Sequence, residues 1–472
     1  MDNCILKCSY PSCGKEYGIG HGLRFYCDDE LEGQHGPALL CAVYTARKIH
    51  VRENLPGVFQ FSDWLPTNNY YFTLPERDLG KPFSYKSDGL GRWLGLTNLY
   101  IAFSGYWPEK GPKLVTRSFK EFEAQAGIGR LLMAYRHQTP PPLIVASAGN
   151  TGNAYSLLTS LLGLPLYLVI PESGLNNLKL PIQTSARILA VRGDYSDAIQ
   201  MAEQLRSLLG AQPDGGVRNI ARRAGMGTVY LNAVAHPNEG THVLFDHYFQ
   251  AVGSGSGAIA TWEAVENLIR DGRFGTTPTR IHVAQNDPFT PIPDAWDQAS
   301  RTLTDYPDEE GRIRIASVTA SVLTNRTPAY SVAGGMHDVL TASRGAAWRV
   351  NNFEVFESAR RFRELEGVDI SPAGAVAVGA LFKAVASRKL APEDRILLHI
   401  TGGGKVVDRS EETFYPAEPV GVVAPHQVQQ ALILIHDEMK IPFRKDLVGC
   451  DRREEILKSK RYVITGMLSR NL

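Results

Sequence analysis

The sequence is poor in cysteine and lacks long apolar runs, and both absences exclude classes of protein. Only six of the 472 residues are cysteine, which is too few for a disulfide-rich secreted scaffold. No apolar run reaches the roughly 18 residues that a membrane-spanning helix needs, and the first residues lack the apolar core of a signal peptide. We therefore expect a cytoplasmic protein that has no membrane partner.

An excess of charge of either sign is also absent. The 50 Lys and Arg residues nearly balance the 49 Asp and Glu residues, which leaves a formal net charge of +1. No long block of like charge is present, so nothing indicates nucleic acid as a partner. A hydrophobic content of 43% and a charged content of 21% are ordinary for a globular protein, and the length predicts two or three domains.

The cysteines that are present gather near the start of the chain. Cys8 and Cys13, the latter followed by Gly14, have the spacing of one knuckle of a zinc ribbon, in which glycine lets the chain fold around the thiolates. The second knuckle is incomplete because acidic residues follow Cys27. Cys8, Cys13 and Cys27 are therefore candidate zinc ligands, and the candidates for a fourth ligand are His35, Cys41 and Cys4. A ribbon that folds without a metal is the alternative.

The most informative stretch is an apolar run that leads into a polar turn and a helix. Residues 140–144 run directly into Val145–Ala154, and the helix that follows ends at Gly163. Such a turn points unpaired N–H groups and the positive end of a helix dipole at a carboxylate or phosphate. Candidate donors for a bound anion are the side chains of Ser147, Asn150 and Thr151. Taken alone, an ordinary capped turn explains the same pattern.

From about residue 116, helical periods alternate with short apolar runs. This order predicts an α/β fold with two doubly wound lobes, and ligands at the carboxyl ends of the strands between them. The expected helices are 118–135, 196–209, 243–252, 258–268, 353–365 and 373–386, and the expected strands are 166–171, 188–192, 281–284 and 395–400.

The same patterns predict five segments. They are a zinc-ribbon-like segment at 1–45, an irregular arm at 46–114 that packs on the large lobe, a smaller α/β lobe at 115–240, a large α/β lobe at 241–440, and a C-terminal extension at 441–472.

A lysine stands in the first turn of the helix expected after Ser118. The positive field of a helix N-terminus lowers the proton affinity of Lys120 and favours a neutral, nucleophilic amine, and burial would add to this effect. Taken alone, Lys120 is more often an ordinary surface lysine.

Two glycine-rich stretches are further candidates. Gly253, Ser254, Gly255, Ser256 and Gly257 could bring consecutive N–H groups onto a phosphate. No Gly-Lys-Ser/Thr closes this stretch, so it is not a Walker loop. We expect it between two helices and not after a strand, so it is not a dinucleotide fingerprint either. At the end of a predicted strand, Thr401–Gly404 places a hydroxyl where a planar ring could approach. A plain glycine turn is the alternative in both places.

Together these features are the parts of a pyridoxal-phosphate site. On these residues the sequence resembles the fold-type-II (tryptophan-synthase-β-like) pyridoxal-phosphate enzymes, in the threonine synthase branch, over roughly residues 1–440. The resemblance implies that Lys120 binds the cofactor aldehyde and later acts as the catalytic base. It also implies that Asn150 contacts the ring hydroxyl, that Gly253–Gly257 bind the phosphate, and that the hydroxyl of Thr401 faces the pyridine nitrogen. Ser147, Asn150 and Thr151 would bind the substrate.

A narrower resemblance is to the cysteate synthases. Ser118–Glu121 replaces the Lys-Asp-Arg of threonine synthases, and Thr401–Gly404 replaces their Thr-Gly-His-Gly. The other supporting stretches are Phe61–Pro66, Gly225–Thr228, Asp246–Gly255, Gln285–Ile292 and Glu366–Ala373. That family replaces the phosphate of O-phosphoserine with sulfite to give cysteate, in archaeal coenzyme M synthesis. The resemblance implies these small molecules as substrates and a homo-oligomer as the assembly.

Other functions stay open at this point. Threonine synthase activity on O-phosphohomoserine, or β-replacement with ammonia or a thiol, would use the same loops. A catalytically silent ligand-sensing relative would have no chemical need for Lys120. A dinucleotide-binding oxidoreductase lacks its fingerprint here. Candidates for gripping phosphate or sulfite are Arg222, Arg223, His236 and His337.

Overall fold

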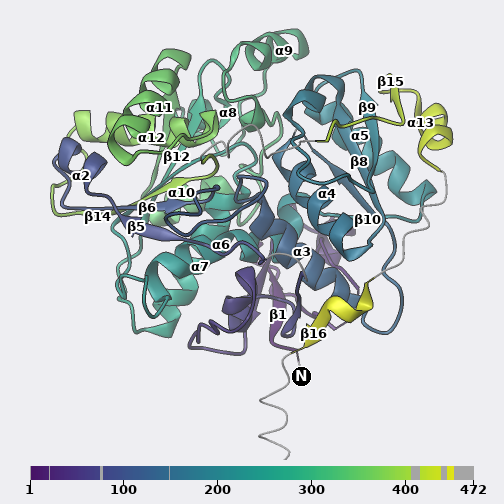
Figure 1. The fold of residues 1–472 in the computed structure, drawn as a ribbon, viewed down its shortest axis with the longest axis horizontal. Helices are drawn as coiled ribbons and strands as arrows, with labels where there is room; N and C mark the ends of the chain where they lie inside the picture. Colours follow the sequence, from purple (N-terminus) through teal and green to yellow (C-terminus); the bar gives the residue numbers. More distant parts are fainter. Residues whose placement is uncertain are drawn as a thin grey trace, which may run out of the picture.

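The computed structural model describes residues 2–20, 22–74, 78–147, 149–404, 415–436 and 444–450. Two larger sheets form the centres of two α/β lobes that lie side by side, with the helix α3 (Lys120–Ala134) between them (Figure 1). The N-terminal ribbon lies below both lobes in the same view. In the described part of the chain, no helix is both long and apolar enough to span a membrane.

The smaller lobe is built on an all-parallel sheet with the order β10-β7-β8-β9-β15. Helix α4 covers one face and α5 the other, as a doubly wound sheet requires. The strands are β7 (Leu143–Ala146), β8 (Leu166–Pro171), β9 (Arg187–Val191), β10 (Gln212–Pro213) and β15 (Gly421–Val423). The helices are α4 (Asn150–Leu162), α5 (Tyr195–Leu208) and α13 (Val428–Ile435). Helix α6 (Ile220–Ala235) packs against α3 and against α7 (Ser256–Asp271) of the larger lobe.

The larger lobe is built on a sheet with the order β13-β12-β11-β14-β6-β5, parallel except for the pair β5 and β6. Helix α12 packs on one face, and α7 and α10 pack on the other. The strands are β5 (Ser84–Lys86), β6 (Asn98–Phe103), β11 (His247–Ala251), β12 (Arg280–Asn286), β13 (Ala346–Val350) and β14 (Arg395–Ile400). The helices are α2 (Gly89–Leu94), α7 (Ser256–Asp271), α8 (Pro291–Asp297), α9 (Asp308–Ser317), α10 (Met336–Ser343), α11 (Asn352–Glu366) and α12 (Pro372–Ala386).

Short elements complete the described chain. The ribbon consists of β1 (Cys4–Cys8), β2 (Glu16–Gly18), α1 (Asp28–Leu31) and β3 (Leu40–Tyr44), and its sheet has the order β2-β1-β3. A separate pair joins β4 (Tyr70–Phe72) to β16 (Val448–Cys450). The 3-10 turns are η1 (Gly57–Trp64), η2 (Glu172–Asn177), η3 (Gly216–Arg218), η4 (Ser321–Leu323) and η5 (Lys445–Leu447).

The predicted α/β fold with two lobes is confirmed, and most of the predicted elements lie where the sequence placed them. The helix expected after the polar turn is α4, and it ends at Gly163, whose φ of 66° is left-handed. Oγ of Ser118 accepts the N–H of Lys120 at 3.3 Å, but the N-cap position of α3 is Phe119, which has no side-chain cap.

One predicted helix is wrong. Residues 243–252 contain the strand β11, and all five residues of this strand are buried. β11 lies between β12 and β14 in the middle of the sheet, and a strand covered on both faces is apolar without a period of two, so its pattern resembles that of a buried helix. The consequence is important for function, because Gly253–Gly257 now follows a strand and precedes α7.

The predicted segment borders also differ from the sheets in two places. Strands β5 and β6, which lie inside the arm predicted at 46–114, belong to the sheet of the larger lobe instead of packing on it. Residues 421–435, which the prediction assigned to the larger lobe, add β15 and α13 to the smaller one. Most of the extension predicted at 441–472 lies outside the described residues.

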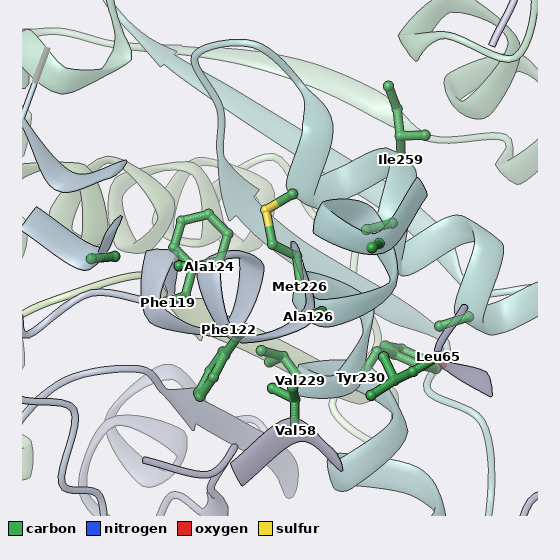
Figure 2. Packing of buried hydrophobic residues seen from close by; sticks show 14 of the residues in the cluster. Val58, Leu65, Phe119, Phe122, Ala124, Ala126, Met226, Val229, Tyr230 and Ile259 are labelled. Atoms are coloured by element: carbon green, nitrogen blue, oxygen red, sulfur yellow. The ribbon is translucent and has the colours of Figure 1, made fainter. Parts of the chain in front are cut away.

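Helix α3 is buried on nearly every side, which fixes the lysine at its start. Phe122 and Ala126 of α3 pack against α6, in a cluster that also includes Val58 from η1 (Figure 2). The two helices approach closely because α6 has a glycine at the contact. A Cβ on Gly225 would lie 2.2 Å from the carbonyl oxygen of Phe122.

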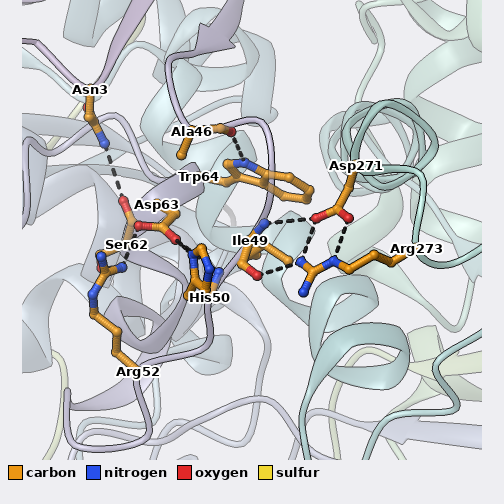
Figure 3. Close-up of polar contacts among 10 residues, drawn as sticks. All are labelled: Asn3, Ala46, Ile49, His50, Arg52, Ser62, Asp63, Trp64, Asp271 and Arg273. Atoms are coloured by element: carbon orange, nitrogen blue, oxygen red, sulfur yellow. Dashed lines mark hydrogen bonds and ion pairs between the residues drawn. The ribbon is translucent and has the colours of Figure 1, made fainter.

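Polar contacts hold the segment 46–65 in place (Figure 3). Asp63 accepts a hydrogen bond from Arg52 at 2.5 Å within this segment. The N–H of Ile49 donates to Asp271, at the end of α7, at 2.9 Å. Asp63 therefore fixes the segment internally, and Ile49 joins it to the larger lobe.

Candidate active site

A cavity of about 570 Å³ lies where the two lobes meet. It is lined by the carboxyl end of β7 and the start of α4, by the loop from β11 to α7, by the start of α3 and by the end of β14. The lining includes all the residues to which the resemblance assigned cofactor or substrate contacts: Lys120, Ser147, Asn150, Thr151, Gly253, Ser254, Gly255, Ser256, Gly257 and Thr401. Parallel strands bring their carboxyl ends to one edge, which is why segments far apart in the sequence meet here.

Lys120 is the first residue of α3, and its amine faces a carboxylate. Its Nζ donates to Oε2 of Glu123 at 3.0 Å, and its side chain is 20% exposed. Burial lowers the pKa of Lys120 below its ordinary value, although the charge of Glu123 opposes the change. The sequence analysis also expected a lowered pKa, with the helix N-terminus as the cause, but burial is the largest cause in the structure.

Glu123 is the residue that sequence reasoning missed. Its side chain is fully buried and accepts from three donors: Nζ of Lys120, Oγ1 of Thr151 at 2.8 Å and Nη2 of Arg222 at 2.8 Å. Burial alone would raise the pKa of Glu123, but the charges of Arg222 and Lys120 outweigh it and hold the pKa below its usual value. The available signal was its spacing, three residues after Lys120 on one helix face.

Of the four cations considered for gripping phosphate or sulfite, only Arg222 lines the cavity. Its guanidinium already pairs with the carboxylates of Glu123 and Asp214. Arg223 is buried against Glu263 elsewhere. His236 lies at the end of α6, and His337 contacts Arg301 and Asp338 at the surface.

Ser147 holds the start of α4 in shape. Its Oγ accepts the N–H groups of Gly149 at 3.0 Å and Gly152 at 2.8 Å, so the hydroxyl proton remains to donate to a ligand. Gly149 has a φ of 149°, and a Cβ there would lie 2.9 Å from Cβ of Asn177. The turn therefore requires glycine at this position.

The loop between β11 and α7 presents unpaired amides to the cavity. The N–H groups of Gly253, Ser254 and Gly255 make no hydrogen bond with the described part of the chain. Gly255 has a φ of 82°, and a Cβ there would lie 2.5 Å from Cγ of Met336. Converging amides at the start of α7 (Ser256–Asp271) are suited to a phosphate group.

Thr401 directly follows β14 and lies next to the start of α3. Its carbonyl oxygen accepts the N–H of Phe119 at 3.1 Å, which fixes the threonine relative to Lys120. The following glycines pass close to other backbone segments: a Cβ on Gly402 would lie 2.7 Å from the carbonyl oxygen of Arg117. The glycine run therefore has a packing reason in addition to the predicted access for a planar ring.

These residues fit pyridoxal phosphate. The cavity offers an amine of lowered pKa for an aldehyde, the unpaired amides of 253–255 for a phosphate, and the hydroxyl of Thr401 for a ring nitrogen. Lys120, Asn150 and Thr401 come from three distant parts of the sequence and line the same cavity. Their individual roles stay predictions.

A second cluster of reactive side chains lies in the ribbon. The ligand atoms of Cys8, Cys13, Cys27 and His35 all lie within 4.8 Å of one another. The structure thus brings together the three predicted cysteines, and of the candidates for a fourth ligand it selects His35. Cys4 and Cys41 are not in the cluster.

Comparison with known proteins gives related results. The family described as "Pyridoxal-phosphate dependent enzyme" matches residues 112–402. The cysteate synthase of Methanosarcina barkeri is 39% identical over 446 residues, which are 93% of this chain and 100% of that protein. The cysteate synthase of Methanoculleus marisnigri is 42% identical over 419 residues, which are 88% of this chain and 92% of that protein.

Solved structures show similarity in fold. Maize serine racemase has a TM-score of 0.52 and 16% identity, over 69% of this chain and 89% of that chain. Diaminopropionate ammonia lyase from Escherichia coli has a TM-score of 0.52 and 14% identity, over 75% of this chain and 93% of that chain. At these identities the likeness extends to the fold alone, and it agrees with the fold type that the sequence predicted.

Proposed function

Because this chain belongs to the pyridoxal-phosphate-dependent enzymes and groups with the cysteate synthases among them, we propose that it replaces the phosphate of O-phospho-L-serine with sulfite. The products are L-cysteate and inorganic phosphate. The observation that carries the proposal is the cavity in which Lys120, the amides of 253–255 and Thr401 lie together. Pyridoxal phosphate supplies the electron sink that lets an α-proton and a β-substituent leave an amino acid.

Lys120 is the residue that moves the α-proton. A lowered pKa increases the neutral fraction of this amine, which is the form that acts as a general base. Glu123 accepts a hydrogen bond from the same amine and so orients it. Arg222 keeps Glu123 ionised, which prevents Glu123 from taking part as an acid.

The substrate carboxylate would lie at the start of α4. The hydroxyl of Thr151 already donates its proton to Glu123. The side chain of Thr151 therefore serves mainly to position the carboxylate of Glu123. The hydroxyl proton of Ser147 and the amide of Asn150 remain as donors, next to the positive end of the α4 dipole. A neutral threonine at position 401 cannot keep a ring nitrogen protonated as a carboxylate would, and this favours loss of a β-substituent over transamination.

The test supplies the purified holoenzyme with O-phosphoserine, with and without sulfite. Phosphate is measured colorimetrically and cysteate by mass spectrometry. We expect both products in equal amounts when sulfite is present. Lys48→Ala is the control, because Lys48 is an exposed lysine outside the cavity, and this variant should form cysteate as the wild type does. Lys120→Ala should lose at least about 1,000-fold of the rate, since it removes the nucleophile and base together.

O-phosphohomoserine is the discriminating second substrate. Release of phosphate from phosphohomoserine, but not from phosphoserine, would replace the proposal with threonine synthase activity. A homo-oligomer and a cytoplasmic location are part of the proposal, and light scattering behind gel filtration measures the first.

A further inference from the structure

The cysteine and histidine cluster of the ribbon has the dimensions of a tetrahedral metal site. Sγ of Cys13 lies 3.5 Å from Sγ of Cys27, and Sγ of Cys8 lies 3.7 Å from Nε2 of His35. A zinc–sulfur bond of about 2.3 Å in a tetrahedron separates two sulfurs by about 3.8 Å. The four side chains are therefore already spaced for one ion.

The surrounding groups orient these ligands. Nδ1 of His35 lies 2.7 Å from the carbonyl oxygen of Gly36, and this contact leaves Nε2 to face the sulfurs. The imidazole also stacks on Tyr10 at 4.4 Å with an interplanar angle of 9°. The N–H of Tyr10 donates to Sγ of Cys8 at 3.5 Å, and the hydroxyl of Tyr17 lies 3.2 Å from Sγ of Cys27.

We propose that Cys8, Cys13, Cys27 and His35 bind one Zn²⁺ as a closed structural site, and that this ion holds one wall of the active-site cavity in place. Four protein ligands leave no position for substrate, so the ion has no part in the chemistry. The ligands come from the end of β1, from the turn after it, and from both sides of α1 (Asp28–Leu31). Metal binding thus ties α1 to the ribbon sheet.

The residues just before Cys27 connect the ion to the cavity. Phe25 and Tyr26 both line it. Phe25 presses on the loop of the smaller lobe at Gly215, where an added Cβ would lie 2.5 Å from the Phe25 ring. The ribbon therefore contributes part of the cavity wall, next to the Gly215 loop of the smaller lobe.

The residues after Cys27 make a second connection. Glu30 of α1 accepts from both terminal nitrogens of Arg218, at 2.7 and 3.1 Å. The guanidinium of Arg218 also lies 4.3 Å from the ring of Tyr26 and donates to the carbonyl oxygen of Ala38 at 3.1 Å. Arg218 itself lines the cavity, so a displaced α1 would release both Arg218 and Tyr26 from the wall.

The first experiment measures metal in the purified holoenzyme by mass spectrometry of the elements. We expect about one zinc ion per chain in the wild type. In Cys13→Ser and His35→Gln, we expect the zinc content to fall by at least about 10-fold. Cys41→Ser is the matched control, because Cys41 lies in the same ribbon but outside the cluster. It should keep its zinc. Cobalt in place of zinc should give the intense thiolate-to-metal absorption of a cysteine-rich tetrahedral site.

Two results would overturn the metal site. One is a zinc-free native protein in which intact-mass analysis finds Cys13 and Cys27 joined as a disulfide. The other is an equal loss of zinc in Cys41→Ser and Cys13→Ser. Circular dichroism and the visible absorbance of the bound cofactor show whether each variant is folded, so loss of zinc is read only in folded protein.

The second experiment tests the connection to the cavity. Removing zinc with a chelator should raise KM for the amino-acid substrate several-fold while bound pyridoxal phosphate stays constant, and adding zinc back should reverse the change. An unchanged KM in the zinc-free protein contradicts the role in the wall. Zinc content is measured without substrate, so a failure of the proposed reaction would leave the metal result standing.

Discussion

Glu123 and Lys120 form a coupled pair at the start of α3, and each changes the proton affinity of the other. The charge of Glu123 keeps the pKa of Lys120 from falling further, and the charges of Arg222 and Lys120 hold the pKa of Glu123 below its ordinary 4.5. Because the shared carboxylate is fully buried, the pair depends on Arg222 for its charge balance. Removing the charge of Glu123 should therefore affect both stability and reactivity.

We predict that Glu123→Gln lowers the free energy of unfolding of the cofactor-free protein by about 3 kcal/mol at pH 7, because a buried ion pair loses one partner. The folded-state pKa of Glu123 is depressed, so its stabilisation is fully present above pH 4.5 and is lost as the pH falls through the lower folded value. Urea unfolding between pH 7 and 3 should therefore show the two proteins converging at low pH.

Glu121→Gln is the matched control for this prediction. Glu121 is buried on the same helix and accepts from Thr116, and it does not line the cavity. It should cost stability without changing the pH at which Lys120 reacts with pyridoxal phosphate. A pH profile of cofactor binding that shifts equally in both variants would contradict a specific role for Glu123.

At the scale of elements, the unit that we propose for phosphate binding consists of strand β11, the glycine loop 253–257 and helix α7. Among the described residues, the N–H groups of 253–255 have no hydrogen-bond acceptor, and the loop requires a left-handed glycine at 255. The opposite end of α7 has a second left-handed glycine, Gly272, with a φ of 84°. A side chain at either position would therefore meet the same backbone strain, and the two positions differ only in the atoms around them.

We predict that Gly255→Ala lowers the affinity for pyridoxal phosphate by at least about 10-fold, since strain and the contact with Met336 displace the amides. Gly272→Ala has nothing within 4 Å of its added Cβ, so it should lose only about 1 kcal/mol of stability and no cofactor affinity. Titration followed by absorbance measures the affinity. Equal losses of affinity in both variants would contradict the assignment of this loop.

At the scale of the whole molecule, the cavity lies where both lobes contribute walls, so a ligand there bridges them. A ligand that binds only the folded protein stabilises it by about 2.7 kcal/mol when its concentration is 100 times Kd. Pyridoxal phosphate would contact the larger lobe through 253–257 and the smaller one through Asn150.

We predict that adding pyridoxal phosphate to the cofactor-free protein raises Tm by several degrees, and that Lys120→Ala shows a smaller rise. Inorganic phosphate should give part of the effect, through the glycine loop alone. Differential scanning calorimetry at fixed protein concentration measures the shifts. A full rise in Lys120→Ala would mean that the lysine adds nothing to binding.

The sequence by itself determined the parts that depend on neighbouring residues. Helix caps, helix dipoles and hydrophobic periods act over one or two turns. They were enough to predict the polar turn before α4, the end of α4 at Gly163, and the position of Lys120 in a first helical turn. The glycine loop was also found, because its composition does not depend on its surroundings. The α/β fold followed from the alternation of such local patterns.

Tertiary structure decided what depends on partners far along the chain. Strand β11 has a pattern that only its burial between β12 and β14 explains. Glu123 became a site residue because Thr151 and Arg222, from α4 and α6, donate to it. The path of the ribbon places His35, and not Cys4 or Cys41, next to the other three side chains of the cluster. Local sequence sets conformation, but only the packed fold brings charges and ligands within bonding distance, and that proximity creates the site.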